Sequence, residues 1–256
     1  MSLNGKEIYR CYDGMGPIQI IDNGDYRYMT FGGNEQQSCL LRSNPALLQH
    51  DYARAMMLVL LFIEPKELLF FGLGGGCMAT CLHHNYPQSK LTAIELRQAV
   101  IDAAYQYFRL PEDERLEVLN MDIQEYFDEV ESMQADIIFS DIYSAVGVDD
   151  QQLTLKYVEE CHRLLSNNGW LVMNFWSSNR KKMTLFDAVY DCFADVRVCT
   201  TGGGNWLLFA GKKVNEQSSE QLKRSANTLS VRLGFSVLNY LNQLQKCIAP
   251  TKLSSR

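Results

Sequence analysis

The spacing of apolar and polar residues changes along the chain, and each change predicts a different kind of structure. Near the start, the runs 17–21 and 26–31 alternate between apolar and polar residues on either side of the turn sequence Asn23-Gly24-Asp25. Such alternation around a glycine-containing turn is typical of β-hairpins, because successive side chains of a strand point to opposite faces. We therefore expect an N-terminal β-hairpin region over residues 1–44.

A different period follows. Residues 45–63 carry apolar side chains at helical spacing, with Pro45 at the start and Pro65 just past the end. Proline is tolerated in the first turn of a helix and stops a helix elsewhere, so this pattern predicts one helix over 45–63. The apolar run inside it, residues 56–63, is too short to span a bilayer.

From residue 67 onward, apolar runs of strand length alternate with segments of helical spacing. The expected strands are 67–71, 90–94, 116–119, 136–140, 170–175, 196–200 and 206–210, and the expected helices are 77–85, 97–108, 123–131, 150–165 and 181–193. Strict alternation of strand and helix predicts an α/β fold with a mainly parallel sheet covered on both faces. The fold class is thus a seven-stranded Rossmann-like sheet whose last two strands form an antiparallel hairpin.

These patterns divide the chain into three parts. The N-terminal hairpin region precedes a nucleoside-binding domain over residues 45–213. Residues 214–256 then hold a polar linker and a C-terminal helix over 228–245, whose apolar stripe we expect to pack on its own domain or on a partner chain.

The first candidate binding residues follow the first strand of the alternating region. The sequence from Glu67 to Ala79 reads ELLFFGLGGGCMA, so a buried strand runs into four glycines at 72, 74, 75 and 76 and then into a helix. Glycine there lets a nucleotide approach the backbone, and the helix start favours its binding. Glu95 follows roughly 20 residues after the first glycine, where this architecture binds a ribose diol. The alternative is a glycine turn that serves only strand–helix packing.

Two further acids follow the next strands. Asp122 comes directly after the third strand of the alternating region, and Asp141 ends the fourth. The carboxyl ends of parallel strands line one crevice, so we expect Glu95, Asp122 and Asp141 side by side. A helix cap at Asp122 and a loop cap at Asp141 are the structural alternatives.

A dinucleotide fingerprint is also possible. Gly74, Gly76 and Ala79 satisfy the pattern G-x-G-x-x-A, which would point to a nicotinamide-dependent oxidoreductase. The positions of Asp122 and Asp141 argue against this hypothesis.

With these residues in place, the sequence over about 7–211 resembles the spermidine synthase-like family of the S-adenosylmethionine-dependent methyltransferase fold. The resemblance implies that Glu95 binds the ribose, that Asp122 binds the adenine amino group with Ile123 against the ring, and that Asp141 is the catalytic aspartate. The segment 31–38, FGGNEQQS, looks like the turn that precedes the family's nucleoside-contacting glutamine, here Gln36.

The chain lacks two acids that aminopropyltransferases of that family carry. Aminopropyltransferases carry an aspartate inside the glycine loop, where this chain has Gly75. They also carry a second acid shortly after the catalytic one, whereas residues 141–145 read DIYSA. The segment His50-Asp51-Tyr52 is only a loose counterpart of the family's Tyr-His-Glu run. The fold family therefore favours aminopropyl transfer and the missing acids favour methyl transfer.

The expected chemistry is attack of a nucleophile on a carbon attached to a sulfonium. Asp141 would accept a proton from an amine nucleophile or orient it, and Tyr143 would hydrogen-bond or stack on the same cation. The cosubstrate would be S-adenosylmethionine or its decarboxylated form, bound by Gln36, the four glycines, Glu95, Asp122 and Ile123. Asn174, Trp176 and Trp206 border the acceptor site in one interpretation, although core packing suits the tryptophans better.

Composition narrows the class of protein further. The net charge is −6 and the pI is near 5.3, which argues against a nucleic-acid partner and suits a cationic small-molecule acceptor. Eight cysteines without a CxxC pair and without a secretory leader indicate a reduced, cytoplasmic chain with no membrane partner. Cys77, Cys81 and His84 share one helix face, but one helix rarely supplies a whole metal site, so we expect no metal.

The main hypothesis is therefore a spermidine synthase-like group transferase that moves an aminopropyl or methyl group to a small amine. The alternative is a non-catalytic nucleoside-binding module in regulation or assembly, which the lost acids motivate. A homodimer is left open.

Overall fold

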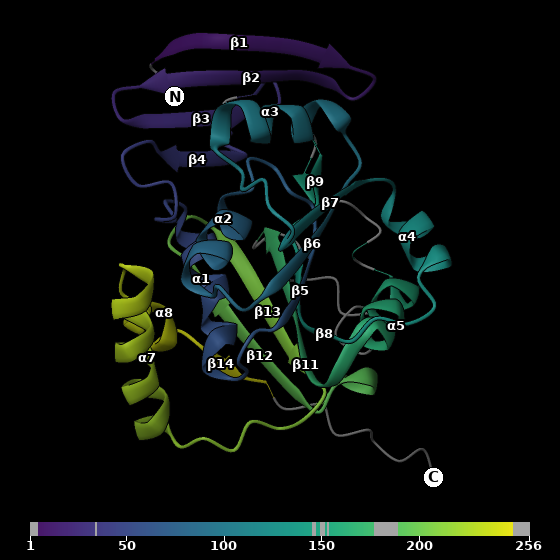
Figure 1. Cartoon of the computed structure of the whole chain (residues 1–256). Helices are drawn as coiled ribbons and strands as arrows, with labels where there is room; N and C mark the ends of the chain where they lie inside the picture. Colours follow the sequence, from purple (N-terminus) through teal and green to yellow (C-terminus); the bar gives the residue numbers. More distant parts are fainter. Residues whose placement is uncertain are drawn as a thin grey trace.

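The computed structural model describes residues 5–33, 35–144, 147–148, 152, 154–176 and 189–247. Two sheets carry the architecture (Figure 1). The first is an antiparallel sheet in the order β1-β2-β3-β4, formed by Lys6–Asp13, Gly16–Asn23, Tyr26–Thr30 and Ser38–Leu41. The predicted N-terminal hairpins are thus confirmed.

The second sheet is central, with strand order β14-β12-β13-β11-β8-β5-β6-β7. Its strands are β5 (Glu67–Phe71), β6 (Lys90–Glu95), β7 (Leu116–Asn120), β8 (Ala135–Ser140), β11 (Leu165–Trp176), β12 (Asp195–Thr200), β13 (Asn205–Gly211) and β14 (Gln245–Lys246). Strands β7, β6, β5, β8 and β11 are parallel, while β13 runs antiparallel to β11 and β12. The α/β prediction and the terminal hairpin are confirmed.

The strand count is one higher than predicted, because Gln245–Lys246 adds a short edge strand beside β12. Two exposed residues cannot show an alternating pattern, so the sequence carried no signal for β14. A further two-stranded ladder, β9 (Tyr143–Ser144) with β10 (Gly147–Val148), follows β8.

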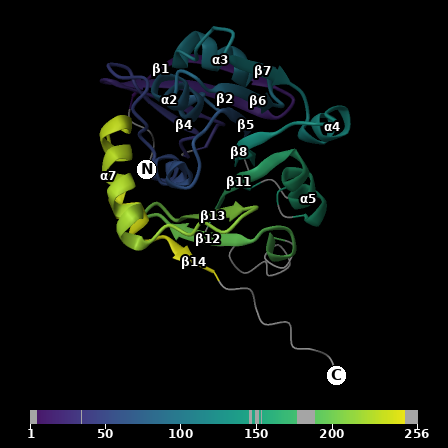
Figure 2. The same ribbon diagram turned by 60° about the horizontal axis from the view of Figure 1, so that its bottom comes forward.

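Helices cover both faces of the central sheet. One face carries α1 (Asp51–Met56), the 3₁₀ helix η1 (Met57–Leu61), α2 (Cys77–Asn85), α7 (Ser219–Leu233) and α8 (Leu238–Leu241), and their side chains share one buried cluster with Phe70 and Phe139. The other face carries α4 (Ile123–Glu129), α5 (Leu155–Leu164) and the short helical stretch 189–192. Figure 2 shows α7 and α5 on opposite sides of this sheet.

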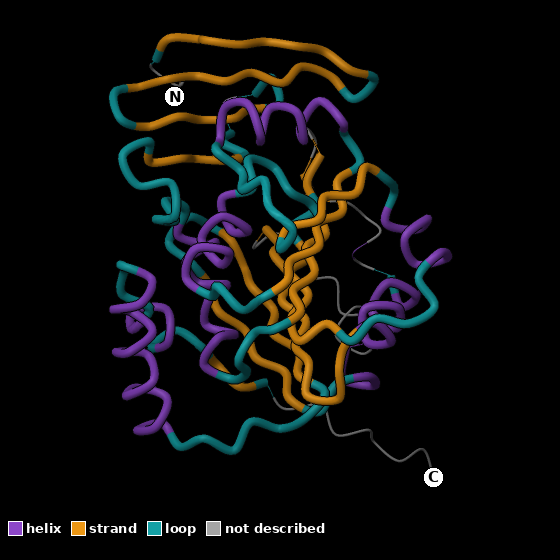
Figure 3. The backbone as a smooth tube through the Cα atoms, viewed as in Figure 1, coloured by secondary structure: helices purple, strands orange, loops and turns teal. Residues whose placement is uncertain are grey.

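The N-terminal sheet forms a separate layer at one end of the central sheet (Figure 3). Helix α3 (Gln98–Phe108) joins the two layers, because Val100, Ala103 and Phe108 pack against Ile18, Ile20 and Met29 of the N-terminal sheet. These residues are fully or almost fully buried, so packed apolar side chains, and not solvent, cover this end of the central sheet.

The helix predicted over 45–63 is wrong in extent. Residues 44–47 form turns, in which the Asn44 N–H donates to the Leu41 carbonyl and the Leu47 N–H donates to the Asn44 carbonyl. The helix begins only at Asp51 and tightens into a 3₁₀ turn after Met56. The apolar spacing was real, but it came from short segments that bury their side chains in one cluster.

The C-terminal prediction also needs correction. Helix α7 begins at Ser219, inside the segment predicted as a linker, and ends at Gly234, which has φ 75°. A capping box between Ser218 and Gln221 starts it, and this S-x-x-Q pattern is visible in the sequence. The expectation that the stripe packs on its own domain is confirmed, since Leu229, Leu233 and Val237 belong to the main buried cluster.

Another predicted helix differs at its start. The helix predicted over 150–165 begins at Leu155, where the Thr154 hydroxyl accepts the N–H of Tyr157 and caps it. Of the helix predicted over 181–193, only residues 189–193 lie within the described residues, and 189–192 are helical.

Candidate active site

One large cavity of about 640 Å³ lies at the carboxyl ends of β5, β6 and β8, under the loop that joins β3 to β4. Glu95, Asp122 and Asp141 all line it, as the placement of acids after successive parallel strands predicted. The other predicted site residues on its wall are Gln36, Gly72, Gly74, Ile123 and Tyr143. Gly75 and Gly76, which we predicted to contact the cosubstrate, do not line the cavity.

The glycine turn is tight because the chain at the end of the neighbouring strand β8 passes close to it. Gly72 has φ 89°, a backbone conformation that favours glycine, and a Cβ there would lie 2.5 Å from the Asp141 carbonyl oxygen. The Gly72 N–H donates to the Ile94 carbonyl at 2.9 Å. Glycine at 72 therefore lets β5, β6 and β8 end together at the cavity.

Gly75 is used for packing. Its N–H donates to the Ser38 hydroxyl at 2.7 Å, and a Cβ would meet the Phe108 ring at 2.6 Å. An acidic side chain at this position would require Phe108 and Ser38 to move. The local packing thus leaves no space for the aspartate that the family carries in this loop. The contacts of Gly75 instead tie the glycine turn to β4 and α3.

Backbone donors hold Glu95 in place. One carboxylate oxygen accepts the Leu73 N–H at 3.1 Å and the other accepts the Arg97 N–H at 3.0 Å. Burial raises the pKa of Glu95, and these backbone hydrogen bonds oppose the rise. The carboxylate is therefore fixed at the cavity wall between the glycine turn and the start of α3.

Asp122 caps α4 and also lines the cavity. It accepts the Gln124 N–H at 2.7 Å, and Glu125 completes a capping box. The structural alternative for Asp122 is therefore confirmed, and it coexists with a position on the cavity wall. Ile123, the first residue of α4, lies beside it with an apolar side chain that is almost fully buried.

Asp141 lies on the cavity wall with intermediate exposure, and its surroundings desolvate its carboxylate. The Asn174 amide donates to it at 2.8 Å, and the Tyr52 hydroxyl also hydrogen-bonds to it. Burial nevertheless raises the pKa of Asp141 to about 6, because removing a carboxylate from water costs more than these two bonds return. Asn205 donates in turn to Asn174 at 3.1 Å and fixes the amide orientation.

Tyr143 follows Asp141 on the same wall. Its buried hydroxyl has no hydrogen-bond partner within the described part of the chain. Burial and the charge of Asp141 raise its pKa above the ordinary value, the nearby Asn205 side chain opposes the rise, and the charge of Glu35 adds to it. An unpartnered buried hydroxyl is costly unless a ligand satisfies it, so Tyr143 is a natural contact for a bound molecule.

Several lining residues had no clear signal in the sequence. Tyr52 reaches Asp141 from α1, a segment whose sequence suggested only a loose motif, and Glu35 and Asp51 bring two further acids to the wall. Such contacts join segments far apart in the chain, so spacing along the sequence cannot show them. Trp176 lines the cavity and is 39% exposed, whereas Trp206 packs beside Phe175 in the core.

The charged side chains of the cavity are mostly acidic. The lining acids among the described residues are Glu35, Asp51, Glu95, Asp122 and Asp141, and the lining cation is Arg97. Arg97 is already engaged by the Asp13 carboxylate at 2.9 Å and by the Gly16 carbonyl at 3.0 Å, with its guanidinium over the Phe31 ring. The site therefore favours cationic ligands.

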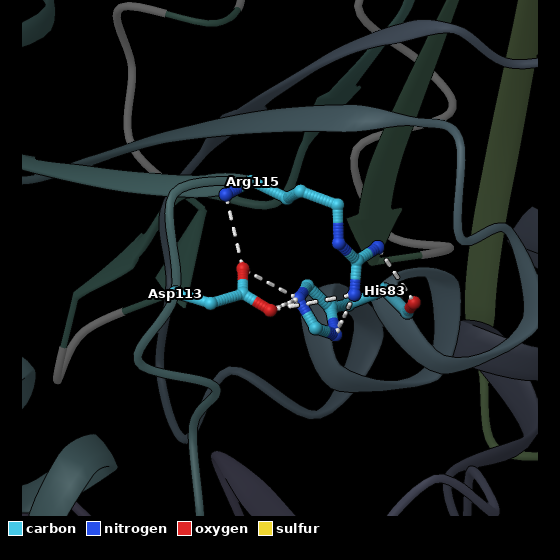
Figure 4. A network of polar contacts seen from close by, with 3 residues as sticks. All are labelled: His83, Asp113 and Arg115. Carbon is cyan, nitrogen blue, oxygen red and sulfur yellow. Dashed lines mark hydrogen bonds and ion pairs between the residues drawn. The ribbon is translucent and has the colours of Figure 1, made fainter.

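The cysteine and histidine residues of α2 have other roles. The Cys77 thiol lines the cavity and contacts the Cys39 carbonyl, and burial raises its pKa to about 12. His83 bonds to Asp113 through Nε2 and to Arg115 through Nδ1, which fastens the end of α2 to the loop before β7 (Figure 4). In the described ranges no three His, Cys, Asp or Glu side chains form a group that could hold a metal.

A parallel sheet that ends in a glycine turn, with three carboxylates around one cavity, is typical of the nucleotide-binding class of α/β folds. The family model for the spermine/spermidine synthase domain matches residues 49–196, which is more than half of the chain. The chain therefore belongs to the spermine/spermidine synthase family. The prediction of a spermidine synthase-like group transferase is confirmed.

Individual relatives agree with this assignment, and solved structures share the fold. A polyamine aminopropyltransferase of Chromobacterium violaceum is 27% identical over 246 residues, covering 94% of each chain. A probable spermidine synthase structure from Corynebacterium glutamicum has a TM-score of 0.73 at 20% identity and covers 96% of this chain and 90% of its own. A spermidine synthase in complex with the transition state analogue AdoDATO has a TM-score of 0.65 at 18% identity, covering 90% and 88%.

Among the helices of the described ranges, none combines the length with the apolar character that a membrane span requires.

Proposed function

We propose that this chain transfers an aminopropyl group from decarboxylated S-adenosylmethionine to a small amine. The observation that carries the proposal is the charge of the cavity: five acids line it, and its one described cation, Arg97, is already bound to Asp13. Both reactants of an aminopropyl transfer are cations, so both suit this field.

The same observation separates the two candidate donors. S-adenosylmethionine carries a carboxylate that would need a cationic or donor-rich partner to leave water. The decarboxylated form carries only the sulfonium and the ammonium. The engaged state of Arg97 therefore supports the decarboxylated donor over the methyl donor, and the polyamine aminopropyltransferase relatives support the same choice.

We assign the nucleoside half of the donor to the predicted residues that line the cavity. Glu95 would accept hydrogen bonds from the ribose hydroxyls, and Asp122 would accept from the adenine amino group while Ile123 packs against the ring. Gln36 would contact the nucleoside from the opposite loop. Gly72 and Gly74 would allow its close approach, and Gly75 and Gly76 would shape the turn behind them.

We assign the transfer step to Asp141 and Tyr143. The attacking nitrogen must be neutral, because its lone pair forms the new C–N bond as the C–S bond breaks and the electron pair stays on sulfur. A carboxylate with a pKa of about 6 can accept the proton that the nitrogen loses and still be ionised at neutral pH. Tyr143 would orient the nitrogen through its unpartnered hydroxyl.

A paired activity measurement tests this function. The protein is incubated with decarboxylated S-adenosylmethionine and a panel of mono-, di- and triamines, and in parallel with S-adenosylmethionine and the same panel. Mass spectrometry should detect methylthioadenosine and an aminopropylated amine in the first reaction. S-adenosylhomocysteine and a methylated amine in the second reaction, without product in the first, would establish methyl transfer instead.

Calorimetry adds a test that needs no turnover. We expect methylthioadenosine and the decarboxylated donor to bind more tightly than S-adenosylmethionine, because the latter must bury its carboxylate among acids. Tighter binding of S-adenosylmethionine would contradict the proposed donor. Nucleoside binding without turnover on any amine would support a binding module.

A further inference from the structure

The acceptor side of the cavity has lost the two acids that the family resemblance leads one to expect. Gly75 stands in the glycine loop, and the run after Asp141 contains no second acid up to residue 145. A cationic acceptor with more than one ammonium group would need another carboxylate. The cavity offers two candidates, Glu35 and Asp51, and both come from segments outside the glycine turn.

Glu35 lies in the loop between β3 and β4, on the same cavity as Asp141. Its side chain is exposed and forms no hydrogen bond or ion pair with any described residue, so its charge is available to a ligand. Tyr143 stands in the field of both carboxylates, since Asp141 and Glu35 each disfavour its ionisation. Tyr143 therefore shares one cavity with both acids and is close enough to each to feel its charge.

Asp51 is in a different situation. Its carboxylate accepts the Tyr240 hydroxyl of α8 at 2.9 Å, and Arg54 follows one turn later on the same helix. The protein itself thus satisfies part of this carboxylate. Of the two acids, Glu35 is the one with unused charge.

On the basis of the proposed function, we propose that Glu35 binds the second ammonium group of the acceptor, which is the one remote from the reacting nitrogen. The acceptor then lies along Tyr143, with its nucleophilic nitrogen at Asp141 and its second cation at Glu35. This defines the acceptor as a linear diamine or longer polyamine, and it disfavours monoamines and neutral nucleophiles.

The experiment compares two acceptors of equal chain length, 1,4-diaminobutane and butylamine, in the wild-type protein and in Glu35→Gln. For the diamine we expect KM to rise about 10- to 100-fold in Glu35→Gln with kcat within a few-fold, as for the loss of one charge-assisted hydrogen bond. For butylamine, KM should already be high in the wild type and should not change. Calorimetric affinity for methylthioadenosine serves as the folding control and should stay constant.

Two matched variants sharpen the comparison. Asp51→Asn removes the other rim acid and should change the diamine KM less than Glu35→Gln does. Glu129→Gln removes an acid at the end of α4, outside the residues that line the cavity, and should change nothing.

The outcomes separate this inference from the function on which it rests. An unchanged diamine KM in Glu35→Gln, an equal loss for butylamine, or a larger effect of Asp51→Asn would overturn the role of Glu35 while aminopropyl transfer stands. Absence of aminopropyl transfer to any amine by the wild-type protein would overturn both.

Discussion

The two ends of the cavity are built in opposite ways. At the end that we assign to the nucleoside, the polar side chains are fixed by nearby backbone: Glu95 accepts two backbone N–H groups, and Asp122 caps the helix that follows it. At the end that we assign to the acceptor, Asp141 is held by Tyr52 and Asn174, which come from distant segments, and the Tyr143 hydroxyl forms no hydrogen bond with a described residue.

This difference has a physical meaning. Backbone hydrogen bonds hold a carboxylate in one orientation and, at Glu95, oppose the rise of its pKa on burial, which suits the recognition of one invariant ligand. A desolvated acid and an unpartnered hydroxyl store free energy that a bound substrate can release, which suits a reaction centre. Changes at the nucleoside end should therefore alter binding, and changes at the acceptor end should alter turnover and its pH dependence.

The largest effect is expected at Asp141. Asp141→Asn keeps the shape of the side chain but cannot accept a proton, so we expect kcat to fall on the order of 10²- to 10⁴-fold. Methylthioadenosine affinity measured by calorimetry should stay within a few-fold. Unchanged turnover would remove Asp141 from the mechanism and with it the contrast between the two ends.

The same variant has an expected effect on stability. Because the folded-state pKa of Asp141 is raised to about 6, the ionised carboxylate costs stability above that pH, and the cost disappears as pH falls below the ordinary aspartate value near 3.8. Asp141→Asn should therefore raise the free energy of unfolding at pH 7 and leave it nearly unchanged at pH 3.5. A loss of stability at pH 7 would show that the charge is stabilised in the fold.

Next in size is the glycine turn. In Gly72→Ala the added Cβ would lie 2.5 Å from the Asp141 carbonyl, and the residue would keep φ near 89°. We expect a loss of roughly 2–4 kcal/mol in the free energy of unfolding, measured by urea denaturation, and weaker methylthioadenosine binding. Gly202→Ala, in an open turn where a Cβ meets nothing within 4 Å, is the control and should change little.

A smaller, more selective effect is expected at Glu95. Glu95→Gln keeps the side chain's size but removes the charge that would accept the ribose hydroxyls. We expect methylthioadenosine affinity to fall about 10- to 100-fold, with kcat at saturating donor within a few-fold. A fall in kcat without a change in affinity would place Glu95 at the reaction centre and contradict the division of the cavity.

The smallest effect tests how Asp141 is tuned. The hydrogen bond from Asn174 lowers the pKa of Asp141, so Asn174→Ala should raise that pKa above about 6. The acid limb of the pH–rate profile should move to higher pH, by up to about one unit, and activity should recover near pH 8. Asn205→Ala keeps the direct bond to Asp141 and should shift the limb less.

Much of the fold follows from local pattern. The strands from 67 to 211 and the antiparallel end of the sheet were predictable, because buried parallel strands read as short apolar runs between turns. Gly72, Glu95, Asp122 and Asp141 were predictable as a group, because the carboxyl ends of adjacent parallel strands must meet at one edge.

Elements without a local signature were missed or misplaced. The helix start moved from 45 to 51 because two turns redirect the chain, and β14 exists only because β12 offers a free edge. Gly75 and Gly76 belong to the same glycine run as Gly72, yet only tertiary packing against Phe108 and Leu110 excludes them from the cavity wall.

By itself, the sequence determined the α/β fold and the part of the cavity that we assign to the nucleoside, since both depend on residues close together along the chain or on the order of strands. Only the tertiary structure brought Glu35 and Tyr52 to the cavity that the predicted residues Asp141, Tyr143 and Asn174 also line. Burial, which sets the pKa of Asp141, is a property of the packed surroundings and not of any residue's neighbours in the sequence.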